Sequence, residues 1–81
     1  MTDVTHAPER HRFESGKAYL SYARDGDSID LQHTVVPPEL EGQGVGGALV
    51  RAAIGFARTE GLRLVVTCPF ARSWLEKHPD A

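Results

Sequence analysis

The chain has 81 residues, of which 41% are hydrophobic and 25% charged, a composition typical of one small globular domain. Nine basic and eleven acidic residues give a formal net charge of -2, which argues against the broad basic surface that binds nucleic acid. A single cysteine excludes an internal disulfide, and with no apolar run near the ~20 residues that cross a bilayer we expect a cytoplasmic protein.

Residues 1–9 are polar and are expected to form a flexible lead-in to one domain over residues 10–81. The first half of that domain alternates apolar and polar residues, which predicts strands at residues 12–15, 17–26 and 28–36. In the third strand, strict alternation places His33 on one face with Ile29, Leu31 and Val35. Short turn sequences join the three segments, so they should form an antiparallel meander.

The second half changes to helical periodicity. Apolar residues at spacings of three and four predict a helix from Gly44 to Glu60, with Gly61 as its C-cap. An apolar segment over residues 62–68 should be a buried strand, and residues 71–78 a short final helix. The order β-β-β-α-β-α predicts an α/β fold with a mixed sheet, in which the meander is followed by one β-α-β crossover.

The segment "GQGVGGALV" places four glycines between the end of the third predicted strand and the first turn of the long helix. A helix N-terminus offers unpaired N–H groups to phosphate oxygens, and glycines let the phosphate approach them. The alternative is a tight turn whose glycines only allow the helix to pack closely on the sheet. The Walker A pattern is absent, because no Gly-Lys-Ser/Thr follows. Gly42, Gly44 and Gly47 match the dinucleotide fingerprint only formally, because the strand does not lead directly into them and no acidic residue follows at the required distance.

The longer segment "VVPPELEGQGVGGALVRAAIGFAR" resembles the acetyl-CoA-binding segment of the GNAT superfamily of N-acetyltransferases. That family ends a strand in Val-x-Pro, as Val36–Pro37–Pro38 does, and then caps the next helix with a Gln/Arg-x-x-Gly-x-Gly/Ala loop. Glu41 stands here in place of the Gln or Arg. The order of motifs from Phe13 to Pro79 resembles the small, single-domain branch of the superfamily.

The resemblance implies a minimal GNAT-like fold with acetyl-CoA as cosubstrate. The backbone of Val35 and Val36 would pair with the pantetheine arm. The amides of Gln43 to Gly47, in the segment Gly42–Gly47 (the glycine loop), would hold the pyrophosphate. The cofactor-binding residues that it implies are Val35, Val36, Glu41, Gly42, Gln43, Gly44, Val45, Gly46 and Gly47.

Two residues are candidates for the chemistry of acetyl transfer. Many members of the family supply a tyrosine as the acid in the last helix, where Leu75 stands here. Cys68, at the end of the predicted final strand, is a candidate for holding the acetyl group or protonating the leaving thiolate, although a buried thiol is also an ordinary small apolar side chain. His33 is a candidate base, with a structural, hydrogen-bonded histidine as the alternative.

The leading interpretation is an acetyl-CoA-dependent acyltransferase that acts on an amine or protein acceptor. The alternative is a CoA-binding or partner-docking module without turnover, and a third is an interaction domain whose glycines only shape a turn. Four histidines and one cysteine lack paired ligand spacing, so no metal site is expected. We expect a monomer or weak homodimer, with neither nucleic acid nor a membrane as a partner.

Overall fold

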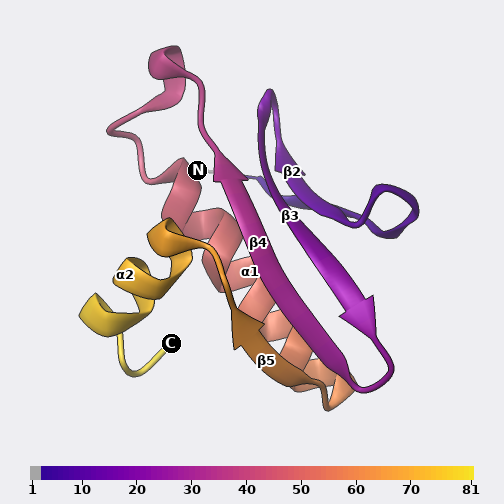
Figure 1. Ribbon diagram of the computed structural model, residues 1–81. Coiled ribbons are helices and arrows are strands. Elements are labelled where there is room, and N and C mark those ends of the chain that lie inside the picture. Colours follow the sequence, from indigo (N-terminus) through magenta and orange to yellow (C-terminus); the bar gives the residue numbers. More distant parts are fainter. Residues whose placement is uncertain (1–2) are drawn as a thin grey trace.

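The five strands of the sheet lie side by side in the order in which they occur along the chain. The computed structural model describes residues 3–81 (Figure 1). Strands β1 to β4 pair antiparallel with their neighbours, whereas β5 pairs parallel with β4 across a helical crossover. The strands are β1 (Thr5–Ala7), β2 (Arg12–Ser15), β3 (Ala18–Asp25), β4 (Ser28–Val35) and β5 (Arg63–Val66), and the helices are α1 (Val45–Glu60) and α2 (Pro69–Lys77). This mixed sheet, with its meander and one β-α-β unit, confirms the predicted fold class.

Strand β1 was not predicted. Residues 1–9 were expected to be a flexible lead-in, but Thr5–Ala7 pairs with β2 and Pro8–Arg10 forms a 3₁₀ turn, while residues 1 and 2 lie outside the described part of the chain. Three residues are too few to show the alternation by which strands are recognised. Pairing with β2 and burial of Ala7 hold the segment in place.

An aromatic cluster fixes this amino-terminal strand to the rest of the fold. The His6 ring stacks on Phe13 at 4.3 Å between centroids and meets the edge of Phe56 at 4.5 Å, and its Nε2 lies 2.6 Å from the Tyr22 hydroxyl. Burial lowers the pKa of His6 from its ordinary value of 6.5, against an opposing effect of the Glu9 charge. Burial likewise raises the pKa of Tyr22.

The core lies between α1 and the sheet face that it covers. Helix α1 begins after Gly44 and ends at Gly61, whose left-handed backbone lets its N–H bond the Ala57 carbonyl, as predicted for a C-cap glycine. Buried side chains of the strands pack against one face of this helix. The main core residues are Phe13, Ala18, Leu20, Tyr22, Ile29, Leu31, Val45, Leu49, Val50, Ala53, Ile54 and Ala57.

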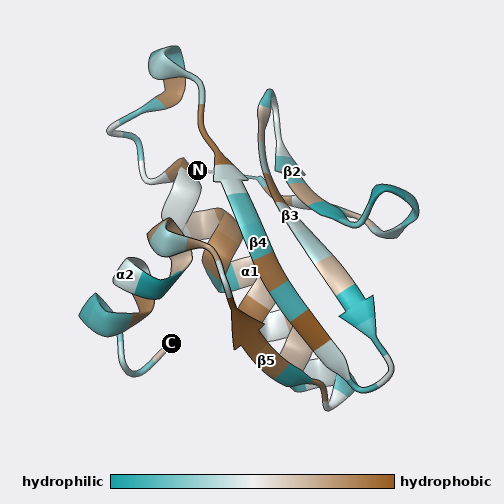
Figure 2. Cartoon of the chain, viewed as in Figure 1, coloured by the Kyte–Doolittle hydropathy of each residue, from teal (hydrophilic) through white to brown (hydrophobic). Residues whose placement is uncertain are grey.

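Strand β5 is buried on only one face, contrary to the sequence prediction of a buried strand. Leu64 and Val66 are partly buried against the core, whereas Arg63 is exposed and Val65 remains 41% exposed. In Figure 1 both helices leave the opposite face of β3 and β4 uncovered, and Figure 2 shows hydrophilic and hydrophobic bands alternating along β4. The sheet therefore has one packed face and one open face.

A bulge in β4 changes which residues reach each face. Tyr22 of β3 pairs with Leu31, but Ser21 pairs with His33, so Gln32 is an extra residue in the β4 strand. Leu31 is fully buried under α1, while His33 is exposed on the open face. The expectation that these two side chains share one face is therefore wrong, because strict alternation does not survive an inserted residue.

Candidate functional site

The site begins where β4 and β5 part. The last paired residues are Leu31 and Val66, and the Leu31 carbonyl then accepts hydrogen bonds from the backbone N–H groups of Thr67 and Cys68 at 3.0 and 2.9 Å. After Cys68 the chain turns into α2, while β4 continues to Val35, so the strands diverge (Figure 1). The described residues show no pairing between the strands beyond this point, which leaves one backbone edge of the end of β4 unpaired.

Two pockets flank the end of β4, and Thr34 and Phe70 line both of them. The larger, of about 790 Å³, lies between the glycine loop and α2. The smaller, of about 480 Å³, lies on the open sheet face and includes Cys68 in its lining. Val36, the residue after β4, lines the larger pocket, and His33 of β4 lines the smaller one.

The glycine loop forms one wall of the larger pocket. Gly42 and Gly44 have φ angles of 79° and 77°, in the left-handed region that favours glycine. Gly44 is the N-cap residue of α1, and in the described chain no side chain caps this helix and no acidic residue occupies its first turn. The first-turn N–H groups of α1 thus lack the partner that a capping side chain would supply, and the positive end of the helix dipole lies at the pocket.

The other two glycines of the loop allow α2 to pack closely on α1. A Cβ at Gly46 would lie 2.7 Å from Cζ of Phe70, and one at Gly47 would lie 2.6 Å from Nε1 of Trp74. The final helix therefore places its aromatic rings against α1, so the close packing allowed by these two glycines is between the two helices. Each of the four glycines has a conformational or packing reason, so glycine content alone does not identify a ligand.

A stack of three side chains completes the wall formed by α2. The Trp74 ring lies 4.1 Å from the His78 ring, and the Arg51 guanidinium of α1 lies 5.3 Å from the centre of the Trp74 ring. All three residues line the larger pocket. Arg51 was not predicted as a site residue; it lies four residues after Gly47, one turn further along the same face of α1.

Both candidate catalytic residues line the smaller pocket on the open sheet face. Cys68 is buried, with 3% of its surface exposed, and its Sγ lies 3.4 Å from Thr34 Oγ1 across the gap between the strands. Cys68 and His33 both line the open-face pocket, so the fold brings these two predicted residues to one cavity. The Thr34 contact was not predicted.

The remaining predicted cofactor residues divide between the pockets and the solvent. Val36 and Glu41 line the larger pocket, as do Gly42 and the run Gly44–Gly47. Val35 instead lies on the open face with 41% of its surface exposed and lines the smaller pocket. Gln43 is outside both linings and donates a hydrogen bond from its side chain to the Glu39 carbonyl at 3.1 Å.

Leu75 occupies the helix position where the resemblance would place a tyrosine, and it packs partly buried against the core. Within residues 3–81, His, Cys, Asp and Glu side chains form no group of three that could hold a metal ion. Nor does any helix there have the length and apolar character needed to cross a bilayer.

Comparison with known proteins agrees with this architecture. Residues 10–81 match the family model described as GCN5-related N-acetyl-transferase. Protein NATD1 of Bos taurus is 39% identical over 64 residues, covering 78% of this chain but only 57% of the bovine protein. Protein NATD1 of Mus musculus is 32% identical over 83 residues, covering 94% of this chain and 76% of the mouse protein. The NMR structure of a GCN5-like protein from Staphylococcus aureus superposes with a TM-score of 0.75 at 32% identity, over 95% of this chain and 80% of that one.

Two features of the fold agree with the family match over nearly the whole sequence. They are the mixed sheet with its diverging strands β4 and β5 and the glycine loop that leads into α1. The chain belongs to the GCN5-related N-acetyltransferase family.

Proposed function

We propose that the protein binds acetyl-CoA in the larger pocket and transfers its acetyl group to an amine that enters from the open sheet face. The observation that carries the proposal is the N-terminus of α1, which has no capping side chain among the described residues and opens into a pocket of about 790 Å³. Backbone N–H groups at a helix N-terminus bind phosphate oxygens well, so the first turn of α1 suits the pyrophosphate. The unpaired edge at the end of β4 suits the amide groups of the pantetheine arm, which can pair as a short strand would.

Other residues of the larger pocket fit the nucleotide end of the same ligand. Arg51 contributes a positive charge one turn beyond the glycines, and Trp74 contributes an aromatic ring beside it. Glu41 is the unfavourable residue in this lining, because a carboxylate near a phosphate is repulsive. It is exposed, so water and salt screen its charge.

Acetyl-CoA, when bound, supplies an activated acyl group as a thioester. In the transfer, the bond between the acyl carbon and the amine nitrogen forms while the carbon–sulfur bond breaks, the amine loses a proton and the CoA sulfur gains one. His33, exposed in the open-face pocket, is suited to take the proton from the amine. The buried Cys68 thiol, held beside Thr34, is suited either to give a proton to the departing sulfur or to carry the acetyl group as its own thioester.

Thermal unfolding with and without CoA tests the binding step, because a ligand that binds only the folded chain raises its melting temperature. We expect CoA and acetyl-CoA to raise it in the unmodified protein and to have little effect on Gly44→Val. Gly26→Val is the matched control, because Gly26 also has a positive φ and open space around it but lies in the distant β3–β4 turn. Gly44→Ala repeats the test with less backbone strain if the valine variant does not fold. The absence of any shift at millimolar CoA contradicts the proposal.

Intact-protein mass spectrometry after incubation with acetyl-CoA then tests the role of Cys68. A single added acetyl group that disappears in Cys68→Ala supports the covalent role. A Cys68→Ala protein that still acetylates amines at the unmodified rate excludes both roles of the thiol.

A second candidate function is a CoA-binding module without turnover, and Leu75 is the observation that favours it. The packed aliphatic side chain of Leu75 offers no hydroxyl at that position to protonate the departing sulfur. A CoA-dependent thermal shift without any acetylated amine would favour this second function over the first.

A further inference from the structure

The open-face pocket contains a row of side chains that crosses three strands. Arg12 of β2 pairs with Ser21 of β3, and Ser21 pairs with His33 of β4, so the three residues lie in line across the sheet. All three line the pocket of about 480 Å³. Strands are spaced by about 4.8 Å, so the row spans about 10 Å between its outer backbones. The His33 end adjoins Cys68, and the Arg12 end is the far wall.

Arg12 is held in place by an aromatic ring. Its guanidinium carbon lies 3.8 Å from the centre of the Tyr19 ring, in the geometry of a cation–π contact. Tyr19 also lines the pocket. Stacking of this kind orients the flat face of the guanidinium and leaves its N–H groups at the edge for a planar or tetrahedral anion.

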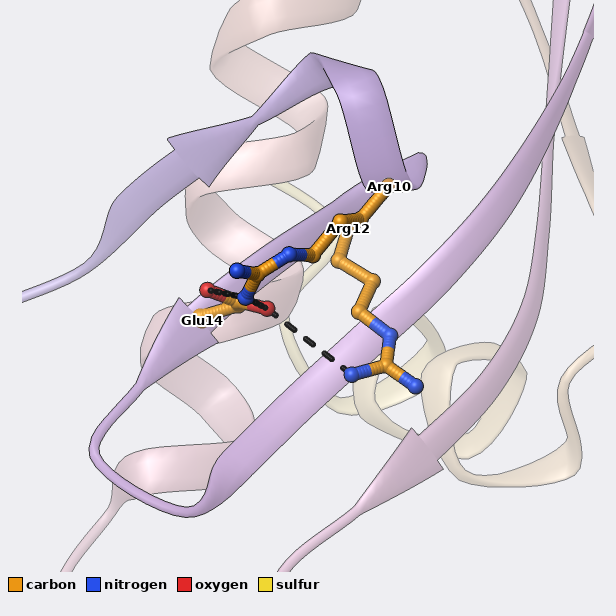
Figure 3. Close-up of polar contacts among 3 residues, drawn as sticks. All are labelled: Arg10, Arg12 and Glu14. Carbon is orange, nitrogen blue, oxygen red and sulfur yellow. Dashed lines mark hydrogen bonds and ion pairs between the residues drawn. The ribbon is translucent and has the colours of Figure 1, made fainter.

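The positive charge of Arg12 is only partly compensated by its surroundings. Glu14 is the carboxylate beside it, with an oxygen 3.8 Å from Arg12, but Arg10 donates to both oxygens of Glu14 at 3.2 and 3.5 Å (Figure 3). Two guanidinium groups thus share one carboxylate, and the cluster keeps a net positive charge. This positive charge suits charge-assisted hydrogen bonds to an incoming anion.

The residues that line the pocket include no aspartate or glutamate in the described part of the chain. Asp30 is on the same sheet face, but it accepts a hydrogen bond from the Thr67 hydroxyl at 2.8 Å and is not part of the lining. An acceptor with a second positive charge would therefore be repelled by the Arg12 guanidinium and would find no carboxylate in the lining to pair with that charge. An acceptor with an anionic group would find a partner at the far wall.

We propose that the acceptor is a small primary amine that also carries a carboxylate or phosphate group, which Arg12 binds while the amine points toward Cys68 and His33. This proposal rests on the acetyltransferase function proposed above. The row of Arg12, Ser21 and His33 sets the separation of the two groups, which suits an amine and an anion joined by a short chain. Arg12 is a specificity residue in this arrangement and does not touch the reacting atoms.

Binding of matched amines to the CoA-loaded, ¹⁵N-labelled protein tests the proposal without requiring turnover. The probes are ε-aminocaproate, its neutral amide, the diamine cadaverine and O-phosphoethanolamine, each followed by the amide signals of Tyr19, Ser21 and His33. We expect ε-aminocaproate to bind about fivefold or more tightly than its amide, because a charge-assisted bond at an exposed guanidinium contributes about that factor. The carboxylate and phosphate probes show which anion the site prefers, and binding of either one above the neutral amide supports the proposal.

Three variants separate this role from a structural one. Arg12→Gln should remove the preference for the acid over the amide, whereas Glu14→Gln should increase it, because the competing carboxylate is gone. Arg63→Gln is the matched control, since it removes the same charge from β5 outside the pocket lining and should change nothing. Equal binding of acid and amide, a preference that survives Arg12→Gln, or no signal change with any small amine overturns the inference. Failure of CoA itself to bind refutes the proposed function instead, so the two outcomes are distinguishable.

Discussion

The close packing of α2 on α1 leads to a stability prediction in which one chemical change has opposite effects at two positions of the same helix. Gly47 and Gly55 are both in α1, and neither has a positive φ. Alanine is a better helix former than glycine by about 1 kcal/mol in a helix interior. At Gly55 a Cβ would meet nothing within 4 Å, so Gly55→Ala should stabilise the fold by up to about 1 kcal/mol.

At Gly47 the same methyl group would lie 2.6 Å from Nε1 of Trp74 and 3.4 Å from two other atoms of that ring. The indole is stacked on His78, so it can move only if that stack or α2 moves with it. Overpacking of this kind costs about 1–3 kcal/mol, and the helix-propensity gain offsets only part of it near the helix start. We expect Gly47→Ala to destabilise the fold by about 1 kcal/mol, a difference of about 2 kcal/mol from Gly55→Ala.

Thermal and urea unfolding followed by circular dichroism measure this difference. A change of 1 kcal/mol moves the melting temperature of a domain of this size by about 4–8 °C, so the two variants should differ by about 8–16 °C. Trp74 is the single tryptophan of the chain, so its fluorescence should change in Gly47→Ala and not in Gly55→Ala. Equal stabilisation by both substitutions would refute the close approach of α2 to the glycine loop.

Three further predictions follow from features of the core and the site. Burial lowers the pKa of His6 below 6.5, so the unfolded chain takes up the proton more readily than the folded one. The free energy of unfolding should therefore fall as the pH drops below about 6.5 and level off below the lowered pKa. In His6→Phe, urea unfolding at several pH values should show a smaller dependence of the unfolding free energy on pH. Arg51→Gln should weaken CoA binding about two- to fivefold at low salt and by less as salt is added. Quenching of Trp74 fluorescence by CoA measures the binding, and a loss of affinity that does not depend on salt would contradict an electrostatic role of Arg51. Thr34→Val should destabilise the fold by no more than about 1 kcal/mol, because it removes one weak contact to Cys68, and should alter the rate at which the thiol reacts with iodoacetamide.

The elements with strong periodicity were predictable, and the short or irregular ones were not. Apolar residues at spacings of three and four and the C-cap at Gly61 predicted α1 almost to the residue. Strand β1 was not predicted because a segment of three residues shows no detectable periodicity. Its stability comes from pairing with β2 and from the packing of His6. The exposure of one face of β5 was not predicted, because an apolar strand sequence does not show whether another element covers its second face.

The candidate site was predictable where a local motif placed it and not where distant segments meet. The glycine loop and Cys68 were identified from sequence, and the structure places them beside the diverging strands. The face on which His33 lies was missed, because the bulge at Gln32 has no signature in a single sequence. The contributions of Arg12 and Arg51 depend on which side chains the tertiary fold brings beside them, and no spacing rule contains that information.

The agreement between strand order and chain order also bears on how the protein assembles. Strands β1 to β4 join only to their sequence neighbours, so short loops close them with little entropic cost and we expect them to form early. Strand β5 must wait until the 16-residue helix α1 has crossed the sheet, and α2 follows it. Both pockets need residues from α2, so the binding site is completed only in the last stage of folding. A ligand held there would therefore bind only chains that have finished folding.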